Sequence, residues 1–250
     1  MNIRSSICLI GFFSLVSCGE NLPEVNNSIN KIMPLGASRV EGNKPEFNGP
    51  LLADQFVSFR YDTWKNLEMN EWSFDLIGTE YDFSDYPDLN NANFDADHQG
   101  NSGFTAADIA GGIESWLQQT GPPDIVLFSS PGGNDALLGM PYDSVVININ
   151  YIIDVLQISN PNITILIEQM APARSDEMTS ELTLFITNLH QEMQSIASNK
   201  STLESQVIAV DMYTGFSDAM LADDVHYNEL GAKFIADRYY DVLKDILKEG

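Results

Sequence analysis

The chain has 250 residues, of which 44% are hydrophobic and 10% aromatic, which is enough for one large domain with a core and excludes a wholly disordered chain. Twelve lysines and arginines against 36 aspartates and glutamates give a formal net charge of −24, and the basic residues form no cluster. Nucleic acid is therefore excluded as an expected partner, because binding a phosphate backbone depends on basic contacts.

Residues 1–17 have the pattern of an export signal. Arg4 precedes an apolar run, residues 7–16, that is too short to span a bilayer comfortably. The run ends in Leu15-Val16-Ser17-Cys18, which resembles a bacterial lipobox, and this resemblance implies cleavage before Cys18 and diacylation of its thiol. We therefore expect a lipoprotein of the bacterial cell envelope, anchored to a membrane and facing the periplasm or the exterior. An ordinary secretory signal that happens to contain a cysteine is the alternative.

The remaining chain divides into a tether and a domain. Residues 18–30 contain Pro23 and several asparagines, as expected of a tether behind the lipidated Cys18. Residues 31–250 contain no internal repeat and no linker, so they are expected to form one domain. Cys8 would leave with the signal and Cys18 would carry lipid, so neither a disulfide nor a thiolate metal site is expected.

The first half of the domain begins with a short strand. Apolar residues 32–35 predict this strand, and residues 51–67 predict a helix that opens after Pro50. Residues 72–77 are expected to form a second strand. Residues 82–101 are rich in Asp, Asn and Pro and have no period, so they predict a long loop.

Strands and helices then alternate to the C-terminus. We expect helices over residues 105–119, 142–159, 175–197 and 228–248, and strands over residues 124–129, 163–167 and 206–210. This alternation predicts an α/β fold, a three-layer α/β/α sandwich around a five-stranded parallel sheet.

Residues with catalytic potential follow several of the predicted strands. Ser38, in Gly36-Ala37-Ser38, follows the first strand, and Asn134, in Gly132-Gly133-Asn134-Asp135, follows the third. The segment Asp223-Asp224-Val225-His226 follows the fifth. In parallel sheets the chemistry collects beyond the carboxyl ends of the strands, so we expect these segments to meet.

A serine hydroxyl needs a neighbouring base, and the chain has three histidines. His190 lies inside a predicted helix beside Gln191 and Glu192, as a solvated surface residue would. His98 lies in the long loop without an evident orienting partner. His226 follows Asp223 by three residues, a spacing at which the carboxylate can hold the imidazole, so His226 is the expected base.

Taken together, these segments resemble the motif blocks of the SGNH hydrolases, also called GDSL esterases and lipases. The family order of Gly-Asp-Ser, an oxyanion glycine, Gly-x-Asn-Asp and Asp-x-x-His is matched here by Gly36-Ala37-Ser38, Gly103, Gly132-Gly133-Asn134-Asp135 and Asp223-Asp224-Val225-His226. The resemblance implies a flavodoxin-like SGNH fold with Ser38 as nucleophile, His226 as base and Asp223 as its orienting carboxylate. It also implies an oxyanion hole made of the Ser38 and Gly103 amides and the Asn134 side chain. Neither a metal nor an organic cofactor is implied.

Further details are similar to carbohydrate esterases of the acetyl xylan esterase kind. They lie in residues 32–36, 74–79 and 97–105. This likeness implies a serine esterase that removes acetyl or other short acyl groups from a polysaccharide through an acyl-serine. Two alternatives remain: a broad-specificity, lipase-like acyl-ester hydrolase, and a catalytically weak glycan-binding pseudoesterase.

The sequence departs from the family pattern at three positions. Ala37 replaces the family aspartate, and its methyl group cannot hydrogen-bond the surrounding loops. Pro131 and Gly133 stand where the family usually has an apolar residue and a threonine. We therefore expect altered or weakened activity rather than none, and a different backbone path before Asn134.

Overall fold

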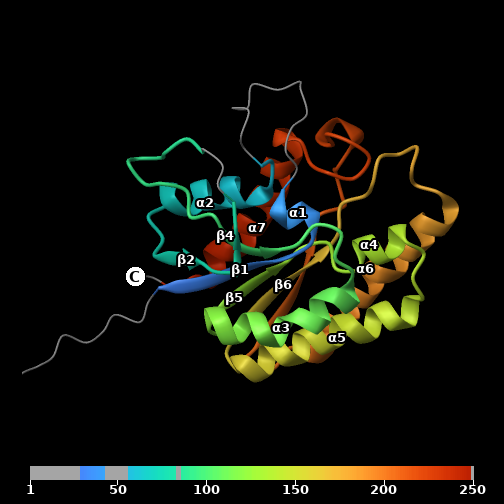
Figure 1. Ribbon diagram of the computed structural model, residues 1–250, viewed down its shortest axis with the longest axis horizontal. Coiled ribbons are helices and arrows are strands. Elements are labelled where there is room, and N and C mark those ends of the chain that lie inside the picture. Colours follow the sequence, from blue (N-terminus) through green and yellow to red (C-terminus); the bar gives the residue numbers. More distant parts are fainter. Residues whose placement is uncertain (1–28, 43–55, 83–85, 249–250) are drawn as a thin grey trace, which may run out of the picture.

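A mostly parallel sheet forms the centre of the molecule (Figure 1). The computed structural model describes residues 29–42, 56–82 and 86–248. The strand order is β3-β4-β1-β5-β6-β7, and β2 also pairs with β1. The strands are β1 (Asn30–Gly36), β2 (Phe74–Leu76), β3 (Glu80–Tyr81), β4 (Asp97–Gly100), β5 (Ile125–Phe128), β6 (Thr164–Gln169) and β7 (Gln206–Asp211).

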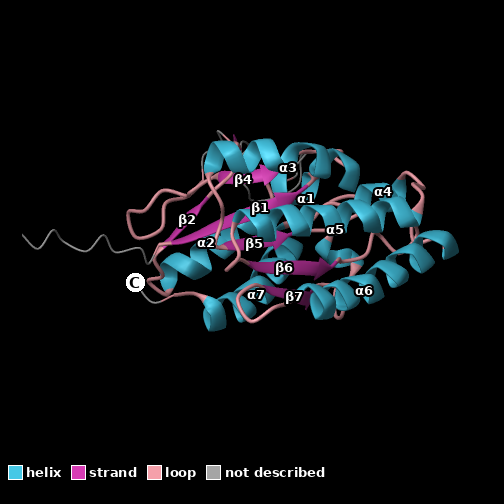
Figure 2. Ribbon diagram, turned by 90° about the horizontal axis from the view of Figure 1, so that it is seen from below, coloured by secondary structure: helices cyan, strands magenta, loops and turns pink. Residues whose placement is uncertain are grey.

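Helices cover both faces of this sheet, as Figures 1 and 2 show. One face packs against α3 (Ala106–Thr120), α5 (Tyr142–Ser159) and α6 (Ser180–Lys200), and the other against α2 (Phe59–Met69) and α7 (Glu229–Ile246). Two short helices, α1 (Ser38–Glu41) and α4 (Gly133–Leu137), lie just beyond β1 and β5. The predicted three-layer α/β/α fold is confirmed.

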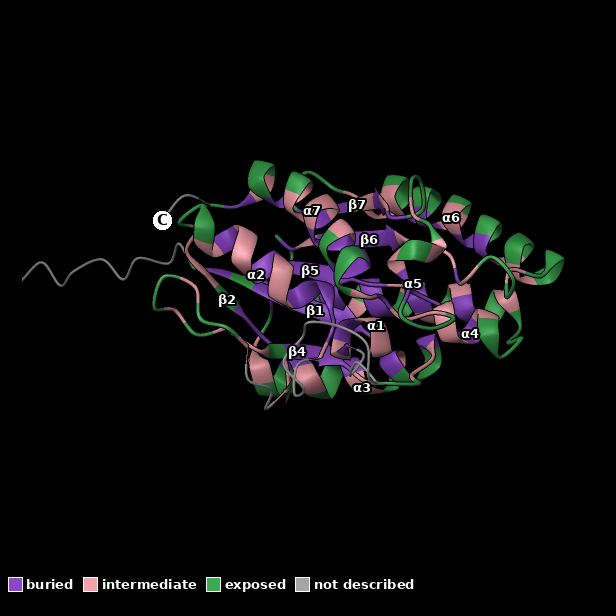
Figure 3. Ribbon diagram, turned by 90° about the horizontal axis from the view of Figure 1, so that it is seen from above, coloured by how far each residue is buried: buried purple, intermediate pink, exposed green. Residues whose placement is uncertain are grey.

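Alternation along β5 shows how the core is divided between the two faces. Val126 and Phe128 pack into the cluster with α3, α5 and α6, whereas Ile125 and Leu127 pack into the cluster with α2 and α7. Successive strand residues point to opposite faces, so a strand covered on both sides is apolar throughout. Figure 3 shows the resulting buried centre between partly exposed helices.

The prediction of five strands is wrong, because the described residues contain seven. β1 meets β2 along its first half, at Asn30–Ile32, and β4 along its second half, at Leu35 and Gly36. After β2 the chain turns away from its neighbour β1 at Gly78, where a Cβ atom would lie 1.9 Å from the His98 carbonyl oxygen. β4 pairs with the second half of β1 in place of β2, and it also pairs antiparallel with β3. Part of the predicted loop is therefore a strand.

Two predicted helix starts are also wrong. α2 begins at Phe59, with the Ser58 hydroxyl accepting a hydrogen bond from the Arg60 amide, and residues 51–55 of the predicted helix lie outside the described residues. α6 begins five residues late, after the capping Thr179. Ser175 is bonded to Asp218 through both its amide and its hydroxyl instead of entering a helix.

The amino end of β1 lies at the opposite end of the strand from Ser38. Asn30, which was expected to end the tether, is already part of β1, and its side chain bonds Ser73 and Lys248. The predicted signal and Cys18 lie outside the described residues. Within the described residues, no helix has the length and apolarity needed to cross a membrane.

Candidate active site

Ser38 is presented by a sharp turn between β1 and α1. A Cβ atom on Gly36 would lie 2.8 Å from the Ser129 carbonyl oxygen, so this close approach requires a glycine. The Ala37 carbonyl then accepts bonds from the Val40 and Glu41 amides, which starts α1 at Ser38. As the first helical residue, Ser38 has an amide without an acceptor in its own helix, and that amide is free for an incoming oxyanion.

The loop after β7 holds the acid–base pair in one tight turn. His226 Nδ1 lies 2.7 Å from Asp223 Oδ2, while Asp223 Oδ1 accepts the His226 and Val225 amides at 2.7 and 2.9 Å. Burial opposes ionisation of Asp223, but these bonds outweigh it and lower its pKa below the ordinary value. A carboxylate only accepts, so Nδ1 carries the proton and Nε2 keeps its lone pair for a hydroxyl proton.

The other expected oxyanion donors come from two separate loops. Gly103 lies in a turn with φ of +81°, a conformation that favours glycine, before α3. The Asn134 side chain donates one N–H to the Phe104 carbonyl at 2.8 Å and keeps its second N–H for a ligand. Buried Asp135 accepts the Ala106 amide at 2.8 Å, so neighbouring residues tie α4 to the start of α3.

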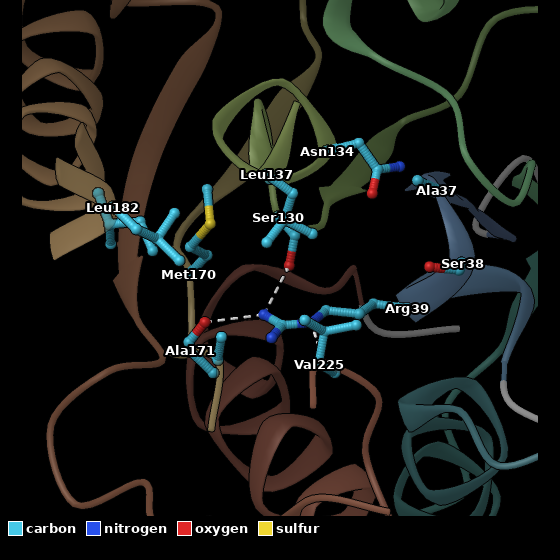
Figure 4. Close-up of a pocket in the computed structure, with 13 residues that line it drawn as sticks. Ala37, Ser38, Arg39, Ser130, Asn134, Leu137, Met170, Ala171, Leu182 and Val225 are labelled. Carbon is cyan, nitrogen blue, oxygen red and sulfur yellow. Dashed lines mark hydrogen bonds between the residues drawn. The ribbon is translucent and has the colours of Figure 1, made fainter. Parts of the chain in front are cut away.

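A pocket with about 510 Å³ of empty space, open to solvent, lies where the loops meet (Figure 4). Ser38 and Asn134 line one end of it, and Val225, the residue before His226, lines its wall. The structure thus brings Ser38, Asn134 and the His226 loop to one edge of the sheet. Leu137, Met170, Ala173, Leu182 and Ile186 add apolar side chains to the lining, and Met170 and Leu182 lie on the side away from Ser38 (Figure 4).

Several solved structures resemble most of this chain. A carbohydrate esterase of family 3 from Talaromyces cellulolyticus has a TM-score of 0.69 and 26% sequence identity, over 88% of this chain and 98% of that chain. A mutant acetyl esterase with acetate ion has a TM-score of 0.68 and 26% identity, over the same shares of 88% and 98%. The chain is a carboxylic ester hydrolase with the SGNH fold.

A member of the lipolytic G-D-S-L family from Veillonella parvula also resembles this chain. Because the sequence identity is low, this likeness supports the fold and not the activity. Its TM-score is 0.59 at 18% identity, over 86% of this esterase and 99% of that chain. No protein-family model matches the sequence, and no curated protein sequence matches it. The esterase therefore resembles the family 3 carbohydrate esterases through its three-dimensional structure.

The two other histidines occupy structural positions in the esterase. His98 is buried in β4, where burial and then the charge of Arg60 lower its pKa to about 2, so it stays neutral. His190 is half-buried rather than a solvated surface residue, because its Nε2 lies 3.1 Å from the Met170 carbonyl oxygen. Among the described residues, no three His, Cys, Asp or Glu side chains are arranged to hold a metal ion.

Two residues whose roles were not predicted from the sequence hold the site loops together. Arg174 Nη2 donates to the Asp223 carbonyl at 2.7 Å, so it braces the acid–base loop from outside. Buried Glu168 accepts the Ser130 amide at 2.7 Å and thereby fixes the loop before Asn134, where Ser130 has a φ of +47°. Single-sequence patterns carry no signal for such contacts, because their partners are backbone groups distant in the chain.

Glu41 connects the serine turn to the loop that carries Gly103. Its Oε2 accepts the Ser102 amide at 2.7 Å, and the Asn101 amide donates to the Gly36 carbonyl at 3.2 Å. Both bonds hold the loop that carries Gly103. The loop is thus attached to the serine turn without an aspartate at position 37.

We expect Ala37→Asp to change kcat/KM for an aryl acetate by less than about threefold, because one further hydrogen bond adds little to a loop that is already held. Steady-state kinetics of the purified variant measure this, with Glu41→Gln as the comparison. A tenfold or larger gain for Ala37→Asp would show that alanine had left the serine turn loose.

Proposed function

We propose that the esterase removes acetyl or other short acyl groups from a polysaccharide through an acyl-serine formed on Ser38. The observation that carries the proposal is the 2.7 Å contact between His226 Nδ1 and Asp223 Oδ2 at the sheet edge that presents Ser38. A preoriented imidazole beside a serine is the arrangement that acyl transfer requires.

In the proposed reaction, the hydroxyl oxygen of Ser38 attacks the ester carbonyl while His226 Nε2 takes the hydroxyl proton. The amides of Ser38 and Gly103 and the second N–H of Asn134 stabilise the developing oxyanion. His226 returns the proton to the leaving alcohol. Water, deprotonated by the same imidazole, then hydrolyses the acyl-serine and releases the acid.

The acetyl substrate is supported by the neighbours' descriptions and by the exposure of the site. One neighbour is described as an acetyl esterase and another as a carbohydrate esterase. The pocket opens to solvent beyond the carboxyl edge of the sheet, where a polymer has access. The pseudoesterase alternative is disfavoured, because Ser38 and the intact Asp223–His226 pair occupy one edge.

The apolar part of the pocket supports a second candidate function, a lipase-like hydrolase of longer acyl esters. Met170, Leu182 and Ile186 offer an acyl chain a surface without hydrogen-bonding groups. Gly133 enlarges this space, since a Cβ atom there would come only into ordinary contact, 3.6 Å from the Ser130 Cβ and 3.7 Å from the Met170 Sδ.

Two assays separate the candidates. Acetate release from acetylated xylan, acetylated pectin and aryl acetates tests the first, and p-nitrophenyl esters from acetate to decanoate test the second. We expect Gly133→Thr to lower kcat/KM for butyrate and longer esters about tenfold and to leave acetate within about threefold, because the added side chain fills the apolar end. An equal change for every chain length would contradict a role of this space in acyl selection.

We also propose that Cys18 anchors the esterase to a membrane of the bacterial envelope. The support is the sequence Leu15-Val16-Ser17-Cys18 behind an apolar run. Two acyl chains are enough for stable anchoring, at about 0.8 kcal/mol for each buried methylene. Fractionation of cells should place the wild type with membranes and Cys18→Ala in the soluble fraction, and equal partitioning of the two would refute the anchor.

A further inference from the structure

Arg39, the residue after the proposed nucleophile, reaches into three other loops at the carboxyl edge of the sheet. Its Nε donates to the Val225 carbonyl at 2.9 Å, in the loop after β7. Its Nη1 donates to the Ala171 carbonyl at 2.8 Å and its Nη2 to the Pro172 carbonyl at 3.1 Å, both after β6. Its Nη1 also lies 3.3 Å from Ser130 Oγ, after β5.

These contacts use almost all of the hydrogen-bonding capacity of the side chain. A guanidinium group has five N–H donors, and four of them are directed to these oxygens. The charged group also lies over the ring of buried Tyr227, 4.8 Å from its centroid. With so few donors left, Arg39 is poorly suited to bind an anionic substrate, although its side chain lines the pocket (Figure 4).

A buried carboxyl group, that of Glu168, lies behind the same contacts. Ser130 Oγ lies 3.2 Å from Glu168 Oε2, and Glu168 Oε1 accepts the Tyr239 hydroxyl at 2.8 Å. Glu168 is fully buried in β6. Arg39, Ser130 and Glu168 thus form a chain of polar contacts from the nucleophile helix into the sheet, and such a chain is costly to break at one member.

We infer that Arg39 is a positioning residue, which fixes α1 and therefore Ser38 relative to the loops that carry His226 and Asn134. The inference rests on the proposed function of Ser38 and His226. Arg39 follows Ser38 directly in a four-residue helix, so its bonds to Val225 and Ser130 constrain the serine as well. Displacement of a reacting group by about 1 Å can cost about 100-fold in rate, so the expected loss appears in kcat.

The test compares Arg39→Met, which keeps the length of the side chain but not its donors, with Arg39→Lys, which keeps the charge. With an aryl acetate we expect Arg39→Met to lower kcat about 10- to 100-fold and to change KM less than threefold, and Arg39→Lys to fall between it and the wild type. Hydrogen exchange, followed by mass spectrometry, should become faster at residues 129–134, 170–174 and 223–227 of Arg39→Met.

Arg238→Met is the matched control, because Arg238 also donates to two backbone carbonyls outside the pocket lining, those of Asp211, the last residue of β7, and Thr214, just after it. It should speed exchange near residues 211–214 and keep kcat within about twofold. If Arg39→Met does not fold, the kcat and the hydrogen exchange of Arg39→Lys test the inference instead.

Unchanged kcat and unchanged exchange in the three loops would overturn the inference. A kcat loss without faster exchange would also overturn it, because the loops would then be held by other contacts. Exchange does not depend on turnover, so the two proposals can fail separately. A wild type without esterase activity refutes the proposed function, whereas faster exchange in Arg39→Met would still support the loop contacts.

Discussion

Ser38→Ala is expected to lower the kcat of ester hydrolysis by 1,000-fold or more while the protein stays folded. Removing the hydroxyl deletes the only atom that forms the proposed acyl intermediate, and the oxyanion donors alone retain a small residual rate. Ser38 is half-exposed at the start of a short helix, so its loss leaves no cavity in the core. Activity and thermal unfolding of the purified variant measure the two effects.

A second serine in the same pocket makes this experiment selective. Ser130 also lines the pocket, but its Oγ lies 3.2 Å from the carboxylate of Glu168 and 3.3 Å from Arg39 Nη1. The Ser130 hydroxyl therefore donates its proton to a carboxyl oxygen and not to an imidazole. We therefore expect Ser130→Ala to lose less than about tenfold in kcat and to be labelled by a fluorophosphonate at Ser38. Labelling of Ser130 in the Ser38→Ala protein would indicate that Ser130, and not Ser38, is the nucleophile.

Elements with a strong local pattern could be predicted from the sequence. α5 has the predicted bounds of residues 142–159, because its buried residues Val145, Ile149 and Ile153 recur at helical spacing and Asn160-Pro161 ends the helix. The start of α3 is also determined by residues close together in the sequence, Thr105 and Asp108. The Thr105 hydroxyl accepts the Asp108 amide, and the Asp108 carboxylate accepts the Thr105 amide in return.

Elements held by tertiary contacts could not be predicted. β4 reads Asp97-His98-Gln99-Gly100, without an apolar side chain, and becomes a strand because its backbone pairs with β1 and β3. Buried Gln99 finds its partners in the amide and hydroxyl of Thr79, 20 residues earlier. Periodicity cannot reveal a strand whose stability comes from such distant partners.

The candidate site divides in the same way. Asp223 and His226 could be paired from the sequence because they lie three positions apart in one turn, and the structure places their side chains 2.7 Å apart. The hydrogen bonds of Arg39 span 91 to 186 positions in the chain, and only the folded sheet edge brings their partners together. The sequence therefore suggested the reacting groups, whereas the residues that orient them emerged from the structure.

Asp223→Asn should lower kcat between 100- and 10,000-fold at neutral pH, nearly as much as His226→Ala. An asparagine can still fit the turn, but its amide can present a donor to Nδ1. The imidazole would then carry its proton on Nε2, the atom that must accept the Ser38 proton. Asp224→Asn is the matched control, because Asp224 bears the same charge one residue away and its carboxylate only approaches Arg174 Nε at 3.5 Å. We expect this control to stay within threefold of the wild type.

The lowered pKa of Asp223 sets the pH below which its contribution to the rate is lost. The pKa of Asp223 lies below its ordinary 3.8, because bonds from His226 and Val225 outweigh its partial burial. Asp223 is thus a carboxylate at every pH above about 4, so its own protonation cannot cause a fall of kcat/KM between pH 8 and pH 5. Its contribution to kcat should disappear only when the pH falls below about 4. Kinetics of the wild type and of Asp223→Asn between pH 3.5 and pH 8 measure this contribution, and equal rates of the two proteins already at pH 5 would contradict it.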